Sequence, residues 1–136
     1  MLMPKKVKYR KTHRGDQIRG PATQKIKLSF GSIGLKTLSA AWITSRQIES
    51  ARRAITGHLQ RRGKLWIRIF PDKSVTVKGN EIRMGGGKGA VDHYVAPVKP
   101  GVIMFEIDGV EVGLARAALK LAAYKLPVKT SIVTKL

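Results

Sequence analysis

The chain has 136 residues, with 27 Lys and Arg against 8 Asp and Glu, a formal net charge of +19 and no cysteine. Its length fits one domain with a single core, and a hydrophobic share of 43% argues against intrinsic disorder. The lack of cysteine excludes disulfides and thiolate metal sites, and no apolar run approaches the roughly 20 residues that cross a bilayer. We expect a folded protein whose positive charge is neutralised by a polyanion.

The first segment is strongly basic. Residues 1–27 carry nine Lys and Arg against one acid, Asp16. Such a segment buries too little apolar surface to fold alone, so we expect residues 1–24 to form an extended arm that becomes ordered on a partner. A solubilising tail is the alternative, but Tyr9 and His13 favour binding because aromatic rings can stack on bases. Residues 25–136 should then form the folded core, with a glycine-rich loop at 79–92.

The core is predicted to begin with a hairpin. Apolar and polar residues alternate in Lys25–Phe30, which is the period of a half-buried strand. The glycines at positions 31 and 34 allow a turn, after which Ile33–Leu38 is expected to return as the second strand.

A capping box predicts the start of a helix near Thr44, because Gln47 follows at the required spacing. The apolar residues that recur at helical spacing are Ile48, Ala51, Ile55 and Leu59, and Gly63 should stop the helix. The basic residues on the other faces are Arg46, Arg52, Arg53, Arg61 and Arg62. A solvated face normally mixes charges, whereas here Glu49 alone opposes them, so we expect these arginines to contact a polyanion.

The remaining elements are mostly strands. Alternation in RRGKLWIRIFP, from Arg61 to Pro71, predicts a strand whose outward side chains suit a polyanion. The expected strands are Leu65–Phe70, Val75–Val77, Val91–Val98, Val102–Ile107 and Thr130–Thr134, with a turn at Pro100 and Gly101. A second helix should span Glu111–Leu126 up to Pro127, with Leu114, Ala118, Leu121 and Ala122 facing inward. This mixture predicts a single-domain α+β fold with mixed or antiparallel strands and two helices.

The glycine loop, RMGGGKG at Arg83–Gly89, does not fit a nucleotide-binding motif. A P-loop needs Ser or Thr after its lysine, but Gly89 follows Lys88, and the dinucleotide fingerprint fails because residues 92–94 resemble the start of a strand. Glycines do let a backbone approach a ligand closely, and Arg83 and Lys88 could bind phosphate oxygens. The alternative is a mobile hairpin tip with incidental charge.

No catalytic or metal site can be assembled from the sequence. His13, His58 and His93 lie in different predicted elements without ligand spacing, and the acids are scattered. We therefore predict a protein that is not an enzyme and has no cofactor or metal. Trp42 and Trp66 could stack on bases, but we favour a core position for Trp66 because aromatics in sheets usually bury most of their area.

Several segments together resemble a known family. They are MLMPKKVKYRKTHRG at the start, FGSIGLK at 30–36, ITSRQIESARRAI at 43–55, RRGKLWIRIFPDK at 61–73, IRMGGGKG at 82–89, VKPG at 98–101 and LKLAAYKLPVKT at 119–130. In this order and spacing they are similar to the bacterial-type large-subunit ribosomal protein numbered sixteen, the universal L-sixteen family. The likeness covers essentially the whole chain. Two departures are the plain triple glycine and HYVAP at 93–97, where many relatives have Trp after an aromatic residue.

The resemblance implies an α+β sandwich of the hammerhead type, bound to large-subunit ribosomal RNA (rRNA) near the peptidyl transferase region. It also implies late joining during assembly, positioning of tRNA at the aminoacyl site, and contact with neighbouring ribosomal proteins. The predicted RNA-binding residues are Lys5, Lys6, Lys8, Arg10, Lys11, His13, Arg14, Arg19, Arg46, Arg52, Arg53, Arg61, Arg62, Lys64 and Arg68. The predicted tRNA-facing loop is Arg83, Met84, Gly85, Gly86, Gly87, Lys88 and Gly89.

Two other functions share some of these features. A DNA-compacting architectural protein would have the same charge, and an RNA-modifying enzyme would need an acid/base or cofactor site that the sequence does not offer. We expect a ribosome-bound protein of the cytoplasm, with an organellar ribosome as the alternative, and neither a membrane nor a small-molecule substrate as partner.

Overall fold

The computed structural model describes residues 1–15 and 18–135; Asp16, Gln17 and Leu136 lie outside the described residues. The described strands are β1 (Ile33–Thr37), β2 (Ala41–Thr44), β3 (Lys64–Ile67), β4 (Lys73–Val77), β5 (Ala90–Val98), β6 (Ile103–Asp108) and β7 (Thr130–Thr134). The described helices are α1 (Ser45–His58) and α2 (Val112–Ala123). All strand pairs are antiparallel, so the predicted α+β class is confirmed.

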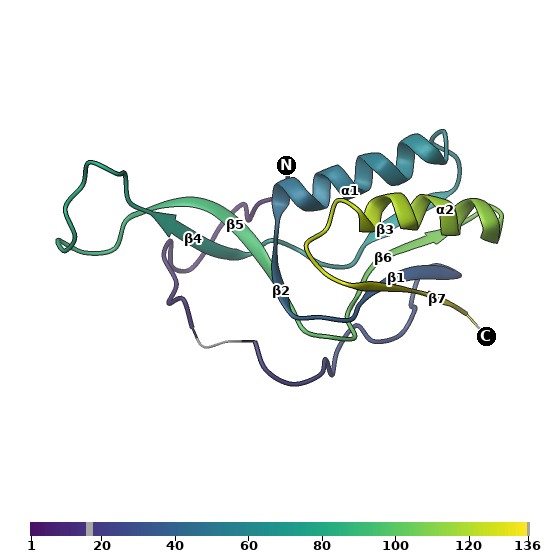
Figure 1. Ribbon diagram of the computed structural model, residues 1–136, viewed down its shortest axis with the longest axis horizontal. Helices are drawn as coiled ribbons and strands as arrows, with labels where there is room; N and C mark the ends of the chain where they lie inside the picture. Colours follow the sequence, from purple (N-terminus) through teal and green to yellow (C-terminus); the bar gives the residue numbers. More distant parts are fainter. Residues whose placement is uncertain (16–17, 136) are drawn as a thin grey trace.

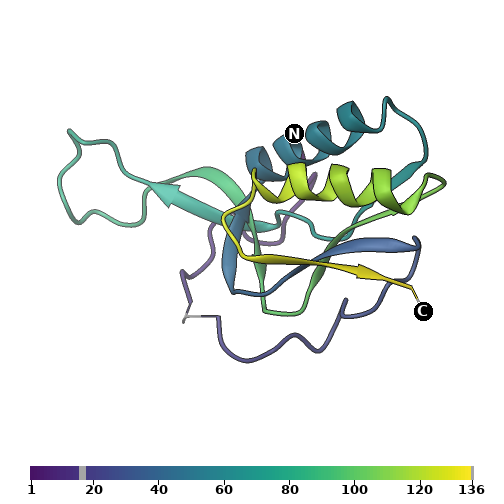
Figure 2. The same ribbon diagram turned by 45° about the vertical axis from the view of Figure 1, so that its right-hand side comes forward.

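A four-stranded sheet in the order β3-β6-β1-β7 carries both helices on one face (Figure 1). Leu35 on β1 and Phe105 on β6 are paired in register and point into the core, where α1 contributes Ile48 and Ile55 and α2 contributes Leu119. These side chains are buried together because each element presents its apolar side to the same layer. The opposite face of the sheet is crossed by the chain that precedes β1 (Figure 2).

The first helix begins as predicted. The Thr44 hydroxyl accepts a hydrogen bond from the Gln47 N–H, and the Gln47 side chain accepts one from the Thr44 N–H, which completes the capping box. The helix ends at His58, earlier than predicted, because Gln60 and Arg61 take left-handed φ angles of 53° and 61° and unwind it. The Arg61 N–H then bonds back to the Thr56 carbonyl at 3.0 Å.

The second helix corrects one of the predicted inward residues. Ala118 and Ala122 are buried and Leu114 is half-buried, as expected, but Leu121 is exposed to 40%. The buried positions are Ala115, Ala118, Leu119 and Ala122, so the apolar stripe faces α1 and β1 and leaves Leu121 outside it. Within the described residues, neither helix has the length and apolarity that a membrane span requires.

The second sheet, in the order β2-β5-β4, carries a long hairpin away from the helices. Strands β4 and β5 pair from Lys73 with Val95 to Val77 with Ala90, and the glycine loop joins them at the far end (Figure 1). The loop therefore stands at one extremity of the molecule, remote from the core between the first sheet and the helices.

The predicted strand at Lys25–Phe30 is absent, so the first predicted hairpin is wrong. Residues 25–30 form bends without strand pairing, and Lys25 has a left-handed φ of 58°. In a strand, successive N–H groups point to opposite sides, whereas here the N–H groups of Ser29, Phe30 and Gly31 all point at one carboxylate. A tertiary contact has overridden the local alternation. The other predicted strands are present, although β3 ends at Ile67, short of the expected Phe70.

Candidate nucleic-acid interface

The N-terminal arm has no helix or strand in residues 1–15 and 18–24, and it lies against the β4–β5 hairpin. Lys11 Nζ donates to the Lys88 carbonyl at 3.0 Å, and Lys88 Nζ donates in return to the Thr12 carbonyl. Lys73 Nζ donates to the Arg14 carbonyl at 2.7 Å. These contacts join the arm to the β4–β5 hairpin from Lys73 to Lys88 and form one basic surface, although the two segments are far apart in sequence.

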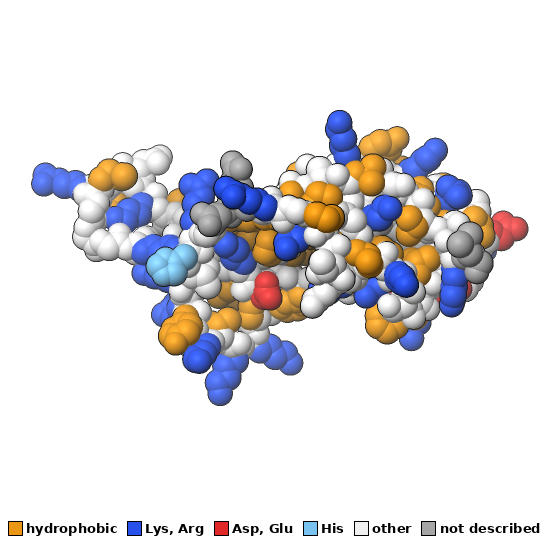
Figure 3. Space-filling model, turned by 90° about the horizontal axis from the view of Figure 1, so that it is seen from below, with side chains coloured by type: hydrophobic (Ala, Val, Ile, Leu, Met, Phe, Trp, Pro, Cys, Tyr) orange, Lys and Arg blue, Asp and Glu red, His pale blue; other side chains and the backbone are white. Residues whose placement is uncertain are grey.

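The predicted arm residues are exposed along this surface. They are Lys5, Lys6, Lys8, Arg10, Lys11, His13, Arg14 and Arg19. Seen from below, Lys and Arg side chains are spread from the hairpin tip to the compact end, with few acidic side chains between them (Figure 3). Like charges at this density repel one another, so bound anions would stabilise the arrangement.

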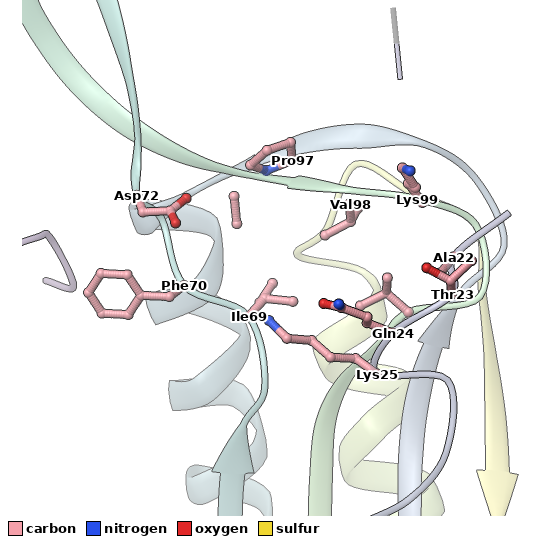
Figure 4. A pocket seen from close by; sticks show the side chains of 12 residues that line it. Ala22, Thr23, Gln24, Lys25, Ile69, Phe70, Asp72, Pro97, Val98 and Lys99 are labelled. Carbon is pink, nitrogen blue, oxygen red and sulfur yellow. The ribbon is translucent and has the colours of Figure 1, made fainter. Parts of the chain in front are cut away.

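The end of the arm borders a hollow beside β5. The lining comes from the arm (Ala22, Thr23, Gln24, Lys25), the link between β3 and β4 (Ile69, Phe70, Asp72) and the region around the end of β5 (Ala96, Pro97, Val98, Lys99, Val102). In Figure 4, Lys25 extends toward Ile69, whereas the Phe70 ring points away from the other labelled side chains. The polar groups of this hollow do not converge on one point, so the hollow does not resemble a small-molecule site.

The arginines of α1 are partly neutralised by their single acid. Arg52 Nε and Nη2 donate to the Glu49 carboxylate at 2.9 and 2.5 Å, and Arg53 Nε donates at 3.1 Å. The hydrogen bond from Arg52 lowers the pKa of Glu49 to about 2, against a smaller opposing effect of burial. Arg46, Arg61 and Arg62 are exposed and have no acidic partner among residues 1–15 and 18–135. Within the described residues, the arginines of this cluster without an acidic partner therefore lie at the start of α1 and just after its end.

Arg68 differs from the other predicted contact residues because its guanidinium is committed within the fold. Its Nη1 donates to Glu106 Oε2 at 2.7 Å and to the Lys27 carbonyl at 2.8 Å, and its side chain is 12% exposed. This ion pair assigns Arg68 a structural role, and its contact with RNA stays a prediction. Lys64, four residues earlier and at the start of β3, is exposed, with Nζ 5.3 Å from the centre of the Trp66 ring.

Glu106 is a residue whose importance the sequence did not reveal. Its carboxylate is fully buried, and Oε1 accepts hydrogen bonds of 3.0 Å from the N–H groups of Ser29, Phe30 and Gly31. Burial acts to raise the pKa of Glu106, but these N–H groups and Arg68 outweigh it and leave the pKa below its ordinary value. The one available signal was an acid inside an otherwise apolar strand, at Val102–Ile107.

The glycine loop is exposed along nearly its whole length. Arg83 is exposed, and Met84 is exposed to 95%. Gly85, Gly86 and Gly87 have φ angles of 97°, 74° and 100°, which residues other than glycine rarely adopt. The Lys78 ammonium donates a hydrogen bond to the Gly85 carbonyl at 2.6 Å. The loop thus offers bare backbone and Arg83 at its tip. Lys88, in contrast, sits next to the arm.

The structure brings no histidine cluster together. His13, His58 and His93 belong to the arm, α1 and β5, and His93 Nδ1 lies 2.7 Å from Asp92 Oδ2. Residues 1–15 and 18–135 contain no group of three His, Cys, Asp or Glu that could hold a metal ion.

Comparison with known proteins decides the family. Residues 4–133 match the family described as ribosomal protein L16p/L10e. The chain belongs to this family of ribosomal proteins. It is 59% identical over 134 residues to the protein named large ribosomal subunit protein uL16c of Cyanidium caldarium, covering 98% of this chain and 95% of that one. It is also 59% identical over 136 residues to large ribosomal subunit protein uL16 of Acidiphilium cryptum (strain JF-5), covering 100% and 98%.

Membership confirms the resemblance inferred from the sequence motifs and separates the competing functions. The family is a structural, non-enzymatic component of the ribosome, so the chain is not an RNA-modifying enzyme. A ribosomal protein also accounts for the excess of positive charge without a role in compacting DNA.

Proposed function

We propose that this chain, a structural constituent of the large ribosomal subunit, holds rRNA with its arm and α1 arginines and presents its glycine loop to tRNA. Family membership supports the association with rRNA and other ribosomal proteins in a ribosome of the cytoplasm or an organelle. The assignment of these contacts to the arm and the α1 arginines rests on their exposed positive charge. The second part, contact of the glycine loop with tRNA, is more specific than family membership supports. It places the loop at the aminoacyl site near the peptidyl transferase region and has the chain join late in subunit assembly.

The observation that carries the tRNA proposal is the position of the glycine loop. The β4–β5 hairpin carries the glycine loop to one end of the molecule, away from the helices (Figure 1), and Arg83 and Met84 in this loop are exposed. A backbone of three glycines without side chains can approach a ribose-phosphate chain closely, and a guanidinium can bind phosphate with two parallel hydrogen bonds. A folded core that binds rRNA would fix where this tip lies.

For rRNA, the arm of residues 1–24 and the α1 arginines supply most of the contacts. Each Lys or Arg that neutralises a phosphate releases a counterion, so the affinity depends on salt. If about six to ten phosphates are contacted, the affinity for an rRNA fragment should fall by about three to five orders of magnitude between 50 and 200 mM salt. The contacts should read backbone and shape, because side chains cannot readily enter the deep groove of A-form RNA.

The tRNA proposal is tested with a double variant. Large subunits carrying Arg83→Ala with Lys88→Ala should bind tRNA at the aminoacyl site about tenfold more weakly or worse, because charge-assisted hydrogen bonds to phosphate are lost. The matched control is Lys120→Ala with Lys125→Ala, which removes the same charge from exposed positions in and just after α2. Equal tRNA binding by both variants, with the protein present in the subunits, would remove the glycine loop from tRNA recognition.

A further inference from the structure

An aromatic pair lies on the face of the four-stranded sheet that the helices leave uncovered. The rings of Phe30 and Trp66 are stacked, with centroids 5.8 Å apart and planes 18° from parallel. Trp66 is half-buried on β3, whereas Phe30 is exposed to 57%. We call these two residues the aromatic platform. An exposed phenylalanine already stacked on one ring has the chemistry to accept a further flat ring.

Cations flank the platform at both ends. Lys64 Nζ lies 5.3 Å from the centre of the Trp66 ring, and the Arg68 guanidinium carbon lies 5.5 Å from the centre of the Phe30 ring. Arg68 is held by Glu106, so its position over Phe30 is fixed. The exposed Lys64 ammonium carries no ion pair with any described residue and can bind a phosphate.

The backbone beneath Phe30 is held rigidly. The Phe30 N–H and those of its two neighbours all donate to the buried Glu106 carboxylate at 3.0 Å. Burying a charge costs free energy even when the charge is paired. Here the hydrogen bonds to the Glu106 carboxylate immobilise the backbone of residues 29–31, while the Phe30 side chain stays exposed. A preorganised aromatic side chain loses little conformational entropy when a ligand stacks on it.

The combination of stacked rings with cations beside them favours a nucleic acid over an apolar partner. Two acids lie at this end of the sheet: Glu106, which is buried and pairs with Arg68, and Asp108, whose carboxylate accepts hydrogen bonds from the Ser32 hydroxyl and the Gly109 N–H. Asp108 is exposed and lies opposite Lys64 on β6, so the cation that the rings present to solvent is Lys64, with Asp108 as its neighbour. Aromatic rings beside Lys and Arg are the combination that binds single-stranded nucleic acid, through base stacking and phosphate contact.

We propose that the aromatic platform binds one unpaired rRNA base, which stacks on Phe30 while Lys64 contacts an adjacent phosphate. This inference rests on the proposed rRNA binding and adds to it a base-contacting site distinct from the arm, α1 and the glycine loop. The site takes any base that is splayed out of a helix, because stacking requires a flat ring and no particular hydrogen-bonding edge.

The first test uses Trp66 as a local reporter. In a full-length Trp42→Phe variant, Trp66 is the remaining tryptophan, and its fluorescence is followed during titration with a short oligoadenylate. The comparison probe is an abasic ribose-phosphate oligomer of the same length, which carries the same charge but no bases. We expect saturable quenching with oligoadenylate and little change with the abasic oligomer. Equal signals from the two probes, or none, would overturn the proposal.

Substitutions then locate the stacking surface. In the same background, Phe30→Leu should weaken oligoadenylate binding detected at Trp66 by about five- to 150-fold, the loss expected for one base stack, and Phe30→Tyr should retain it. The matched control is Phe70→Leu, at another exposed phenylalanine (44%), which should bind like the parent. Equal effects of Phe30→Leu and Phe70→Leu would overturn the proposal. Thermal unfolding checks that each variant is folded. If Phe30→Leu does not fold, the comparison of oligoadenylate with the abasic oligomer on the Trp42→Phe parent tests the proposal.

A measurement in the assembled subunit separates this inference from the proposed function. Subunits carrying Phe30→Leu should retain the protein after a salt wash and gain chemical reactivity at one unpaired rRNA base. If the subunits retain the protein but no rRNA base changes its reactivity, base stacking on the aromatic platform is rejected while rRNA binding stands. A crosslink from Phe30 to a neighbouring ribosomal protein would have the same consequence. Failure of the unsubstituted chain to associate with the subunit would instead reject the proposed function itself.

Discussion

The buried carboxylate of Glu106 provides the sharpest test of how this fold is held together. Glu106→Gln keeps the shape of the side chain and removes its charge. The amide oxygen can still accept the N–H groups of residues 29–31, but the amide nitrogen then faces the Arg68 guanidinium, where Oε2 now accepts at 2.7 Å. Two donors cannot bond to each other, so Arg68 is left as a poorly compensated, largely buried cation.

The expected cost is large for one substitution. Removing one partner of a buried ion pair typically costs about 3 to 5 kcal/mol, and we expect about 3 kcal/mol because the Lys27 carbonyl still accepts from Arg68. For a chain of 136 residues this corresponds to a fall in Tm of about 10 °C. The measurement is thermal unfolding followed by circular dichroism in parallel with urea unfolding, in buffer with enough salt to keep the basic chain in solution.

Two controls determine whether the reasoning holds. Adding Arg68→Met to Glu106→Gln should recover part of the loss, because the uncharged Gln and Met pair leaves no unpaired charge. Glu49→Gln removes an acid from the surface of α1 and should cost less than about 1 kcal/mol. A Glu106→Gln variant that unfolds at the same temperature as Glu49→Gln would refute the assignment of the buried Glu106–Arg68 ion pair as a contact that stabilises the fold.

Other expected outcomes follow from contacts at single positions. Glu49→Gln should bind rRNA more tightly, because Arg52 and Arg53 lose their intramolecular partner; in a binding assay at matched salt, weaker binding would contradict this. Its small stability deficit should be present above pH 4.5 and vanish as the pH falls toward 2, the pKa of Glu49 in the fold, as pH-dependent urea unfolding would reveal. Gly34→Ala should lower stability by about 1 to 3 kcal/mol, because a Cβ there would lie 2.7 Å from Leu28 Cδ2 and 2.9 Å from the Phe105 carbonyl oxygen. Gly57→Ala in α1, with nothing within 4 Å of a Cβ, should raise it by about 0.5 to 1 kcal/mol in the same urea assay.

Local patterns predicted the elements whose structure depends on neighbours in sequence. The capping box of α1 needs Thr44 and Gln47, which are close in the chain, and the buried stripe through Ile48 and Ile55 follows from helical periodicity. The strand at Thr130–Thr134 matches its prediction for the same reason. Prediction was weaker at boundaries, because the left-handed turn that ends α1 uses Gln60 and Arg61, whereas the helix was expected to continue to Gly63.

The candidate interface was predictable to the same extent. The excess of Lys and Arg with few opposing acids indicated the arm and the α1 arginines, and the run of glycines indicated a loop whose backbone can approach a ligand. The left-handed φ angles of Gly85, Gly86 and Gly87 were seen only in the structure. Which cations are committed within the fold was not predictable. Arg68 alternates along its strand like an exposed residue, yet its guanidinium is held by an acid that lies 38 residues further along the chain.

The sequence by itself determined the charge, the helices, most strands and the family, because these depend on composition, on short-range periodicity or on motifs preserved in order. The tertiary structure decided the conformation of residues 25–31. Their apolar alternation favours a strand, but three of their N–H groups bond to Glu106, with the Gly31 donor 75 residues away from it. A buried carboxylate must find donors wherever the fold supplies them, and that requirement outweighs a local preference worth far less free energy.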